Sequence, residues 1–457
     1  MKQTRVVIIG AGISGLMCAE RLSHNQNFEV VIVDKGNSVI NRKCPAITGR
    51  KCLHCNPCNI MHGIGGCGAF SDGKFIATSA YGGWLNQYIN NTDEYIKQCA
   101  NILATYTDHI DTFYGSDELK EQCYKYDLHM QTTTVLHFGS DGIQEIISKW
   151  VDDLINRGVK ILTNYNVIDI NIDNKLINCI RGKDSTKYIL SYDKLVLAPG
   201  RSGSDWFYKF CIDNSIPTCN NQIDIGVRVE MPNVIWREIS EKIYEPKILY
   251  RTQQYGDIVR MFCFNYGGEV VCENTNNVLT VNGHANNSSG EHTDNCNFAL
   301  LSTINFTKPF NAPNDYIKHI CQLSNMISGG SVIVQRLGDL KLGRRTDEKR
   351  LKQSTTQPTL KNAVAGDLSL CMPKRFLDNV LETLDRLNCI APGTNNYDTL
   401  LYAIEAKYYS VKPIFKNVST FEIIDDIYGM GDGVGITRSL SQAGAMGLYI
   451  AEILQKG

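Results

Sequence analysis

The apolar positions near the start of the chain form a pattern typical of buried parallel strands. Residues 5–10 and 29–34 are short runs dominated by Val and Ile, and a helical stretch to about residue 23 lies between them. Continuous apolar runs of this length indicate strands that are covered on both faces. We therefore predict a β-α-β unit at the beginning of the chain.

Other periodicities follow further along the chain. Residues 141–157 place apolar side chains three and four positions apart, which predicts an amphipathic helix. We also expect helices over residues 92–115 and 376–408. From about residue 216 to 345, short alternating segments recur with little helical pattern between them. This alternation predicts an antiparallel sheet.

Composition and charge narrow the class of protein. The chain has 457 residues, of which 43% are hydrophobic and 20% are charged, as expected for a globular protein of more than one domain. Its formal net charge of −1 argues against nucleic acid as a partner. No apolar run reaches the roughly 18 residues that a membrane helix needs. We expect a soluble, cytoplasmic protein without a membrane partner.

The turn after the first strand carries a dinucleotide-binding pattern. Gly10, Gly12 and Gly15 have the G-x-G-x-x-G spacing, and Asp34 and Lys35 follow the second strand. The first two glycines allow a tight turn and a close approach of the backbone to a diphosphate, and the third allows close packing of helix and strand. Asp34 is expected to accept hydrogen bonds from ribose hydroxyls. The sequence therefore predicts a nucleotide cofactor.

Two later glycine turns favour FAD over NAD. Residues 195–200 form a strand that runs into Gly200, and a Gly431-Asp432-Gly433 turn precedes the last helical stretch. A carboxylate at this second turn is suited to the hydroxyls of a ribityl chain, and the helix beginning beyond it presents a partial positive charge to the cofactor. A dehydrogenase that binds only NAD does not need this third segment.

These motifs together resemble the FAD-binding fold of the glutathione-reductase superfamily. More narrowly, GIGGCGAFSDGKF at residues 63–75 resembles the signature of an uncharacterised FAD-dependent dehydrogenase family, which lies near the geranylgeranyl reductases. Cys67 departs from that pattern, which has Ala at this position. Beyond the motif residues above, the expected cofactor contacts are Gly65, Gly66, Gly68, Ser71, Asp72, Val167 and Arg201.

The expected architecture is an α/β protein. A Rossmann-like FAD-binding domain is assembled from discontinuous segments, and an antiparallel-sheet α+β substrate domain is inserted into it. The expected segments are 1–90, 140–215 and 411–457 for the FAD-binding domain, 91–139 for a helical insertion, and 216–410 for the substrate domain.

Four cysteines follow the second strand at spacings typical of metal ligands. Cys44, Cys52, Cys55 and Cys58 include two successive C-x-x-C steps, and Pro45 is adjacent to the first of them. Four thiolates at this spacing are suited to a [4Fe–4S] cluster that would feed single electrons to a flavin. A structural zinc site is the first alternative. A redox dithiol, formed by Cys55 with Cys58 or by either with Cys67, is the second.

The catalytic candidates are Lys74 and Cys67. A positive charge at Lys74 would stabilise reduced flavin if it lay near the N1–C2=O edge of the ring. No second G-x-G-x-x-G occurs between residues 140 and 345, so we expect electrons from transiently bound NAD(P)H or from a ferredoxin-like donor protein.

The sequence thus predicts an FAD-dependent reductase or dehydrogenase acting on a small, unsaturated molecule. Two other classes remain open at this point. One is a flavin-dependent RNA-modifying enzyme, and the other is a non-catalytic redox sensor that holds flavin and metal.

Overall fold

The computed structural model describes residues 2–44, 53, 55–71, 73–182, 185–275, 278–284, 293–307, 309–310, 312–407 and 409–456. They form two compact units. Unit 1 comprises Met1–Thr112, Val135–Asn221 and Tyr409–Gly457, whereas unit 2 comprises Phe113–Thr134 and Gln222–Tyr408.

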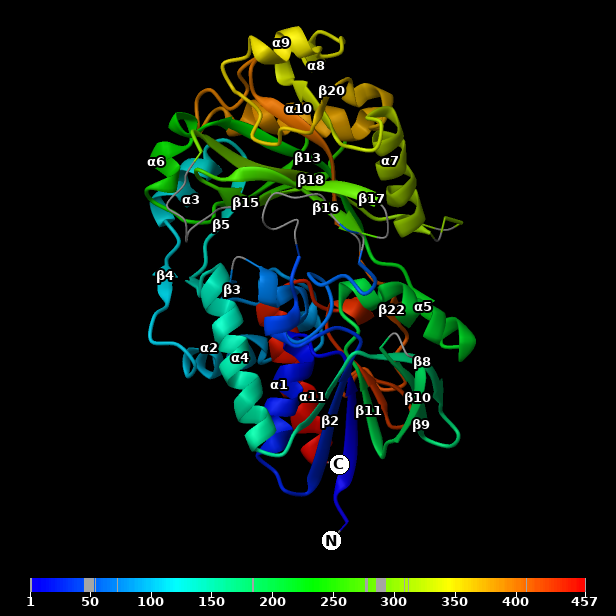
Figure 1. The fold of residues 1–457 in the computed structure, drawn as a ribbon. Coiled ribbons are helices and arrows are strands. Elements are labelled where there is room, and N and C mark those ends of the chain that lie inside the picture. Colours follow the sequence, from blue (N-terminus) through cyan, green and yellow to red (C-terminus); the bar gives the residue numbers. More distant parts are fainter. Residues whose placement is uncertain are drawn as a thin grey trace. The chain divides into compact units, whose positions relative to one another are not determined.

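Unit 1 is built on a six-stranded sheet in the order β23-β24-β11-β1-β2-β7 (Figure 1). Five neighbouring strands run parallel, and only β23 at one edge is antiparallel. The strand order places β1 between β2 and β11, so the carboxyl ends of the parallel strands meet at one edge of the sheet. The strands are β1 (Thr4–Ile9), β2 (Phe28–Asp34), β7 (Lys160–Thr163), β11 (Lys194–Leu197), β23 (Glu422–Ile424) and β24 (Ile427–Gly429).

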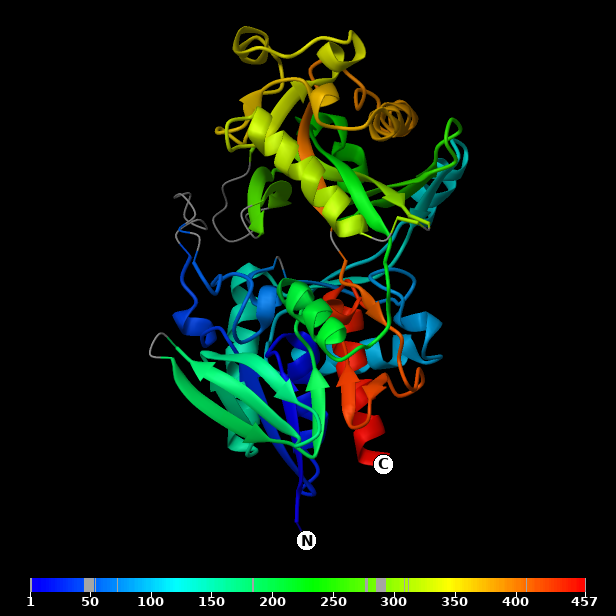
Figure 2. The same cartoon turned by 90° about the vertical axis from the view of Figure 1, so that its right-hand side faces the viewer.

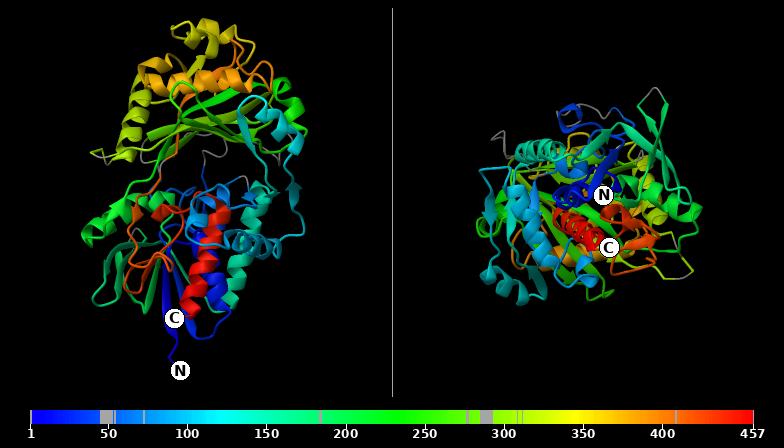
Figure 3. Two further views of the ribbon diagram at one scale, coloured as in Figure 1. Left: turned by 180° about the vertical axis from the view of Figure 1, so that it is seen from behind. Right: turned by 90° about the horizontal axis from the view of Figure 1, so that it is seen from below.

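Helices pack against this sheet and against one another. The first helix, α1 (Ile13–Ser23), lies along the last, α11 (Leu440–Lys456), although most of the chain separates them in sequence (Figure 3). Gly447 makes this approach possible, because a Cβ at this position would lie 2.2 Å from the carbonyl oxygen of Ser14. Further helices of unit 1 are α2 (Thr92–Ala104), α4 (Ser140–Asn156) and α5 (Ser204–Asp213).

Smaller sheets complete unit 1. An antiparallel sheet in the order β10-β9-β8 follows the parallel strand β7 in the chain (Figure 2). Its strands are β8 (Tyr165–Asn171), β9 (Leu176–Arg181) and β10 (Thr186–Ser191). The short strands β3 (Lys74–Ile76), β4 (Asp111–Phe113) and β6 (Val135–His137) form another sheet, and β12 (Thr218–Cys219) pairs with β22 (Lys412–Pro413).

Unit 2 contains an eight-stranded sheet in the order β20-β19-β21-β13-β18-β15-β14-β5. All neighbouring strands run antiparallel except β19 and β20. The strands are β5 (Leu128–Gln131), β13 (Ile223–Pro232), β14 (Lys247–Arg251), β15 (Ile258–Asn265), β18 (Asn295–Ile304), β19 (Ile333–Arg336), β20 (Val364–Ala365) and β21 (Leu400–Lys407).

One face of this sheet forms the core of unit 2. Alternate residues of β13, such as Ile225 and Val227, are fully buried in a cluster with side chains of α7 (Pro313–Ile327) and α10 (Lys374–Leu387). The hairpin of β16 (Glu269–Thr275) and β17 (Val278–His284) contributes to a second apolar cluster. The remaining helices of unit 2 are α3 (Asp117–Tyr124), α6 (Arg237–Ser240), α8 (Leu337–Lys341) and α9 (Glu348–Lys352).

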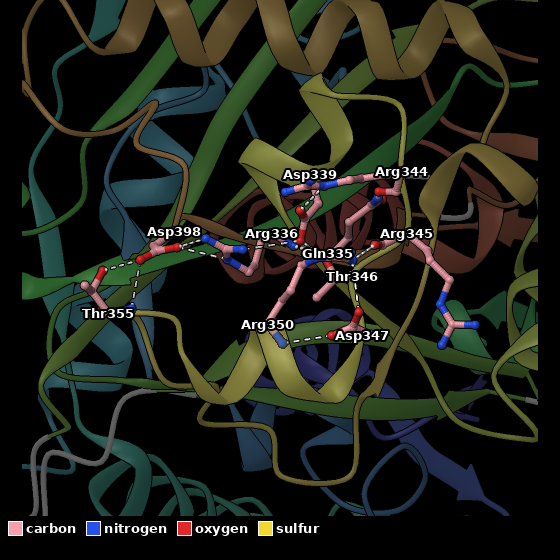
Figure 4. Close-up of polar contacts among 10 residues, drawn as sticks. All are labelled: Gln335, Arg336, Asp339, Arg344, Arg345, Thr346, Asp347, Arg350, Thr355 and Asp398. Atoms are coloured by element: carbon pink, nitrogen blue, oxygen red, sulfur yellow. Dashed lines mark hydrogen bonds and ion pairs between the residues drawn. The ribbon is translucent and has the colours of Figure 1, made fainter.

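A buried carboxylate organises the segment that contains α8 and α9 (Figure 4). Asp339 is 1% exposed and accepts hydrogen bonds from Thr346 at 2.8 Å and from Nε of Arg344 at 2.8 Å. Arg336 reaches the same carboxylate and also pairs with Asp398. Several basic residues of this stretch therefore have acidic partners: Arg336 and Arg344 contact Asp339, and Arg350 pairs with Asp347.

The structure confirms the predicted fold class and corrects parts of the element assignment. The strands expected over 5–10 and 29–34 are β1 (Thr4–Ile9) and β2 (Phe28–Asp34), and the helix expected over 141–157 is α4 (Ser140–Asn156). The helix expected over 92–115 ends at Ala104. The helix expected over 376–408 ends at Leu387, and residues 400–407 form β21 instead.

The division into units also differs from the expected segments. Phe113–Thr134 belongs to unit 2, so residues 91–139 do not form one helical insertion. The reason is a strand pairing that the sequence does not reveal, because β5 within this segment pairs with β14. The substrate domain was expected over residues 216–410. The corresponding segment of unit 2 is Gln222–Tyr408.

Candidate cofactor site

A cavity lies in unit 1 where the carboxyl ends of β1, β2, β11 and β24 meet. Ligands bind at this edge in open parallel sheets, because the strand order reverses there and leaves a crevice. The predicted cofactor residues that line the cavity are Gly10, Gly12, Asp34, Lys35, Gly65, Gly66, Gly68, Ser71, Val167, Gly200, Arg201, Gly431 and Asp432.

The glycine turn opens the middle of the cavity. Gly12 precedes α1, and no side chain among the described residues caps the helix, so its first backbone N–H groups lack a side-chain partner there. A Cβ at Gly12 would meet nothing within 4 Å, whereas one at Gly15 would lie 2.1 Å from the carbonyl oxygen of Gly10. Gly12 thus leaves room on the cavity side, and Gly15 allows α1 to pack on the turn. An uncapped helix N-terminus with this space is suited to a diphosphate.

Asp34 marks one end of the cavity. Its carboxylate accepts backbone hydrogen bonds from Ala11 and Gly36, each at 2.8 Å. A carboxylate has further lone pairs, so it can still accept from ribose hydroxyls. Lys35 also lines the cavity, and burial lowers the pKa of its ammonium group while the charge of Asp34 acts in the opposite direction.

The Gly65–Gly68 segment lies directly on the glycine turn. The N–H of Gly65 donates to the carbonyl of Ala11 at 2.8 Å, and the two segments form a bridge at Gly12 and Gly65. Gly66 has a φ of 57°, and a Cβ there would lie 3.1 Å from the Cα of Gly12. These glycines therefore allow two backbone segments to meet at the centre of the site.

Arg42 fixes this segment in place. The residue is 3% exposed, and its guanidinium donates to four carbonyl groups, those of Asn59, Ile60, Ile64 and Gly66, at distances between 2.5 and 2.8 Å. Burial lowers the pKa of Arg42 to about 10, which still leaves it charged at neutral pH. The residues between the cysteines and the glycines are thus held by one buried cation.

Asp432 marks the other end of the cavity. It follows β24, and its Oδ1 accepts a hydrogen bond from the hydroxyl of Thr437 at 2.6 Å. Nε of Arg201 lies 4.0 Å from the other carboxylate oxygen. Burial raises the pKa of Asp432, and the charge of Arg201 acts against this rise. The carboxylate is thus placed to accept hydrogen bonds from a ligand.

The two acids lie at the ends of an extended site. Asp34 ends β2 and Asp432 follows β24, and in the sheet β1 and β11 lie between these strands. Three strand spacings separate them, which corresponds to about 14 Å. The glycine turn lies between the two acids. A dinucleotide with a hydroxylated group at each side of its diphosphate fits this arrangement of donors and acceptors.

His62 adds an acceptor or donor that the motif does not include. It lines the cavity, and its Nδ1 lies 3.2 Å from the carbonyl oxygen of Cys58. Among the described residues its buried Nε2 has no hydrogen-bond partner. A buried polar atom without a partner is unusual in folded proteins, and this one belongs to a residue that lines the cavity.

Several predicted site residues have other positions. Gly15 and Gly433 do not line the cavity, but a Cβ at Gly433 would lie 2.6 Å from the carbonyl oxygen of Gly200, so both glycines allow close packing around it. Lys74 lies in β3 opposite His137 and is not among the lining residues, so the geometry gives no support to its expected role beside the flavin. Asp72 lies outside the described residues.

Cys67, in contrast, lines the cavity. Its Sγ lies 3.6 Å from a guanidinium nitrogen of Arg201, the same side chain that approaches Asp432. The departure from the family pattern therefore falls within the site.

The cysteines of the expected metal site are described only in part. Cys44 and Cys58 are half-buried, Cys55 is exposed, and Cys52 lies outside the described residues. Within the described part of the chain, no group of three or more His, Cys, Asp or Glu side chains comes together as a metal site. The four-cysteine site stays a prediction.

Comparison with known proteins found one family model and one distant relative that match the sequence. A family model described as an NAD(P)-binding Rossmann-like domain matches residues 8–65. An uncharacterised protein of Clostridium beijerinckii is 23% identical over 480 residues, covering 99% of this chain and 81% of its own length.

Among the helices of the described residues, none is long and apolar enough to cross a membrane.

The solved structures that match this chain are less similar to it in sequence. An L-proline dehydrogenase from P. horikoshii is 12% identical, with a TM-score of 0.41, over 100% of this chain and 94% of that one. A flavoprotein/dehydrogenase from Cytophaga hutchinsonii is 10% identical, with a TM-score of 0.42, over 100% of this chain and 79% of that one. Similarity at this level carries no argument about function, which rests on the site itself.

Proposed function

We propose that the chain is an FAD-dependent oxidoreductase. The observation that carries the proposal is the extended cavity along the carboxyl edge of β2, β1, β11 and β24, with a carboxylate at each end and an uncapped helix N-terminus between them. The Rossmann-like match over residues 8–65 supports a nucleotide at the Asp34 end. The third segment at Asp432 supports FAD, because a ribityl chain needs an acceptor there.

Different residues of the cavity bind different parts of such a cofactor. The first turn of α1 receives the diphosphate, Asp34 accepts from the adenosine ribose, and Asp432 accepts from the ribityl hydroxyls. Arg42 keeps the Gly65–Gly68 segment against the glycine turn. Bound FAD would supply a two-electron carrier whose N5 could pass electrons between the donor and the substrate.

The substrate and the electron supply are further parts of the proposal. A small, unsaturated molecule is supported by the resemblance of residues 63–75 to a family near the geranylgeranyl reductases. A [4Fe–4S] cluster on Cys44, Cys52, Cys55 and Cys58 is supported by the C-x-x-C spacing alone. Transient NAD(P)H is the alternative donor.

Titration of the purified protein with FAD tests the central claim. We expect stoichiometric binding with quenched flavin fluorescence, and Asp432→Ala should weaken the affinity at least tenfold because an acceptor for the ribityl hydroxyls is lost. The matched control is Asp425→Ala, whose carboxylate is 83% exposed. Binding of NAD⁺ with no binding of FAD would overturn the proposal.

The cysteine site has a separate test. Protein purified without oxygen should contain iron and sulfide in equal amounts, and Cys58→Ser should remove both. Zinc in place of iron, or a reversible dithiol with neither metal, would contradict the cluster and leave FAD binding unaffected.

A further inference from the structure

An arginine at the cavity is held between two aromatic rings. The guanidinium carbon of Arg438 lies 3.6 Å from the ring centre of Trp84 and 3.0 Å from that of Tyr409. The two rings are themselves in edge contact, with centres 6.2 Å apart. A cation enclosed in this way has few alternative positions, so its charge is fixed in space. Arg438 also lines the cavity.

Backbone contacts fix the same arrangement. The N–H of Arg438 donates to the carbonyl of Gly82 at 2.8 Å, and the N–H of Trp84 donates to that of Ile436 at 2.9 Å. Gly83 pairs with Thr437 between them, and its φ of 136° favours glycine. Trp84 and Arg438 therefore lie on two segments that are far apart in sequence but are hydrogen-bonded to each other.

The position of Arg438 within the cavity follows from its neighbours. The charges of Arg201 and Arg438 both act to lower the pKa of Asp432, whereas burial raises it. Lys35, in contrast, interacts with Asp34 at the other end. Arg438 also comes two residues before α11, whose N-terminus carries a partial positive charge. The Asp432 end of the cavity thus combines a helix N-terminus with an immobilised guanidinium.

We propose that Arg438, held between Trp84 and Tyr409, is the cation that stabilises negative charge on the reduced flavin ring. The inference rests on the proposed FAD-dependent function and gives Arg438 the role that the sequence had indicated for Lys74. Bound FAD would accept a hydride at N5 from a donor such as NAD(P)H, which would be oxidised as the flavin is reduced, and the reduced ring would carry a negative charge at its N1–C2=O edge. A fixed cation at that edge favours the reduced state.

Trp84 and Tyr409 are positioning residues in this proposal. They do not carry the charge, but they hold the guanidinium in one place. A guanidinium that moves freely in water loses much of its electrostatic effect, because the solvent screens it. Replacing Arg438 should therefore affect the reduced flavin more strongly than replacing either aromatic ring.

Sulfite affinity of the FAD-loaded protein tests the proposal without any substrate. Sulfite adds through sulfur to N5 of oxidised flavin, and the electron pair it brings places a negative charge at the same N1–C2=O edge. Arg438→Gln should weaken sulfite binding at least tenfold, which corresponds to about 1.4 kcal/mol, and should make the flavin harder to reduce. Arg438→Lys should recover part of the loss, and Trp84→Leu should lie between Arg438→Lys and the unchanged protein.

Arg375→Gln is the matched control, because it removes an arginine that also contacts an aromatic ring, that of Tyr255, but belongs to unit 2 and does not line the cavity. It should leave sulfite affinity unchanged once FAD is bound. Unchanged sulfite affinity and reduction potential in FAD-loaded Arg438→Gln would overturn the inference, although the proposed function would stand. Failure of the unaltered protein to bind FAD would instead overturn the proposed function.

Discussion

Gly12 and Gly15 lie in one turn but differ in what surrounds them. A Cβ at Gly12 would enter open space, and one at Gly15 would collide with the carbonyl of Gly10 at 2.1 Å. We predict that Gly12→Ala leaves the stability of the FAD-free protein unchanged and weakens FAD binding at least tenfold, because the methyl group occupies the place of the diphosphate. Thermal unfolding without FAD and a fluorescence titration measure the two effects.

Gly142→Ala is the control for this prediction. It lies in α4, and a Cβ there also meets nothing within 4 Å. It should stabilise the protein by roughly 0.5–1 kcal/mol through helix propensity and leave FAD affinity unaltered. Unchanged FAD affinity in Gly12→Ala would show that the diphosphate does not lie at this turn.

At the residue scale, the sequence indicated those site residues that belong to short local motifs. Gly10, Gly12 and Asp34 belong to one short β-α-β unit, so their spacing alone predicts their arrangement. Arg438 and Arg42 escaped prediction, since an arginine near a turn has no characteristic spacing. Arg438 is recognisable only when Trp84 and Tyr409 are seen around it.

At the scale of elements, a buried carboxylate connects α1 to α4. Glu20 accepts from Nε1 of Trp150 at 2.6 Å and from both terminal nitrogens of Arg157, at 2.9 and 2.6 Å. Burial raises the pKa of Glu20, but these hydrogen bonds outweigh it and hold the pKa below its usual value. We predict that Glu20→Gln destabilises the protein by about 2 kcal/mol at neutral pH, measured by denaturant unfolding.

The pH dependence of this contribution has a definite sign. Because the pKa of Glu20 is lower in the folded protein, its contribution is present above the unfolded value of about 4.3 and is lost as the pH falls through the folded value. Glu20→Gln and the unaltered protein should therefore converge in stability in acid. Glu145→Gln, at an exposed pair with Lys149, is the control and should cost less than about 1 kcal/mol. A constant difference across pH would contradict the assignment.

A second element-scale prediction concerns α8 in unit 2. Asp339 accepts from Thr346, Arg344 and Arg336 while being 1% exposed. Asp339→Ala should destabilise unit 2 by about 3 kcal/mol, because buried donors and a cation are left without their acceptor. Asp385→Ala, whose carboxylate is 55% exposed, should cost less than about 1 kcal/mol. Urea unfolding measures both, and equal effects would contradict a central role for Asp339.

Helices and strands were predictable where the spacing of their apolar residues matches the faces that they bury. The helix at residues 141–157 has one apolar face, and α4 buries that face. Residues 400–407 were wrongly expected to be helical, because LLYAIEAK has no alternation that distinguishes strand from helix. Seven of the eight residues of β21 are buried, since the strand lies inside the sheet and is covered on both faces.

At the scale of the whole molecule, the limit of prediction is pairing between distant segments. The fold class followed from the β-α-β start and the alternating strands. The membership of Phe113–Thr134 in unit 2 did not, because β5 pairs with β14 across more than a hundred residues. Long-range strand pairs leave no local signal in the chain.

The division into two units leads to a last prediction. Every described residue that lines the cavity belongs to unit 1. A ligand that binds only the folded state stabilises it by about 2.7 kcal/mol at a hundredfold excess over its dissociation constant. FAD should therefore slow hydrogen exchange more strongly in amides of unit 1, such as those of β1 and α1, than in the sheet of unit 2.

Mass spectrometry of peptides from both units measures this difference. Asp432→Ala protein with the same FAD concentration is the control, and its unit 1 should gain less protection because fewer of its sites are filled. Equal gains in β1 and in β13 would mean that unit 2 contributes as much to holding the cofactor as unit 1 does. That outcome would move the site away from the carboxyl edge of the parallel sheet, where both acids and the glycine turn lie.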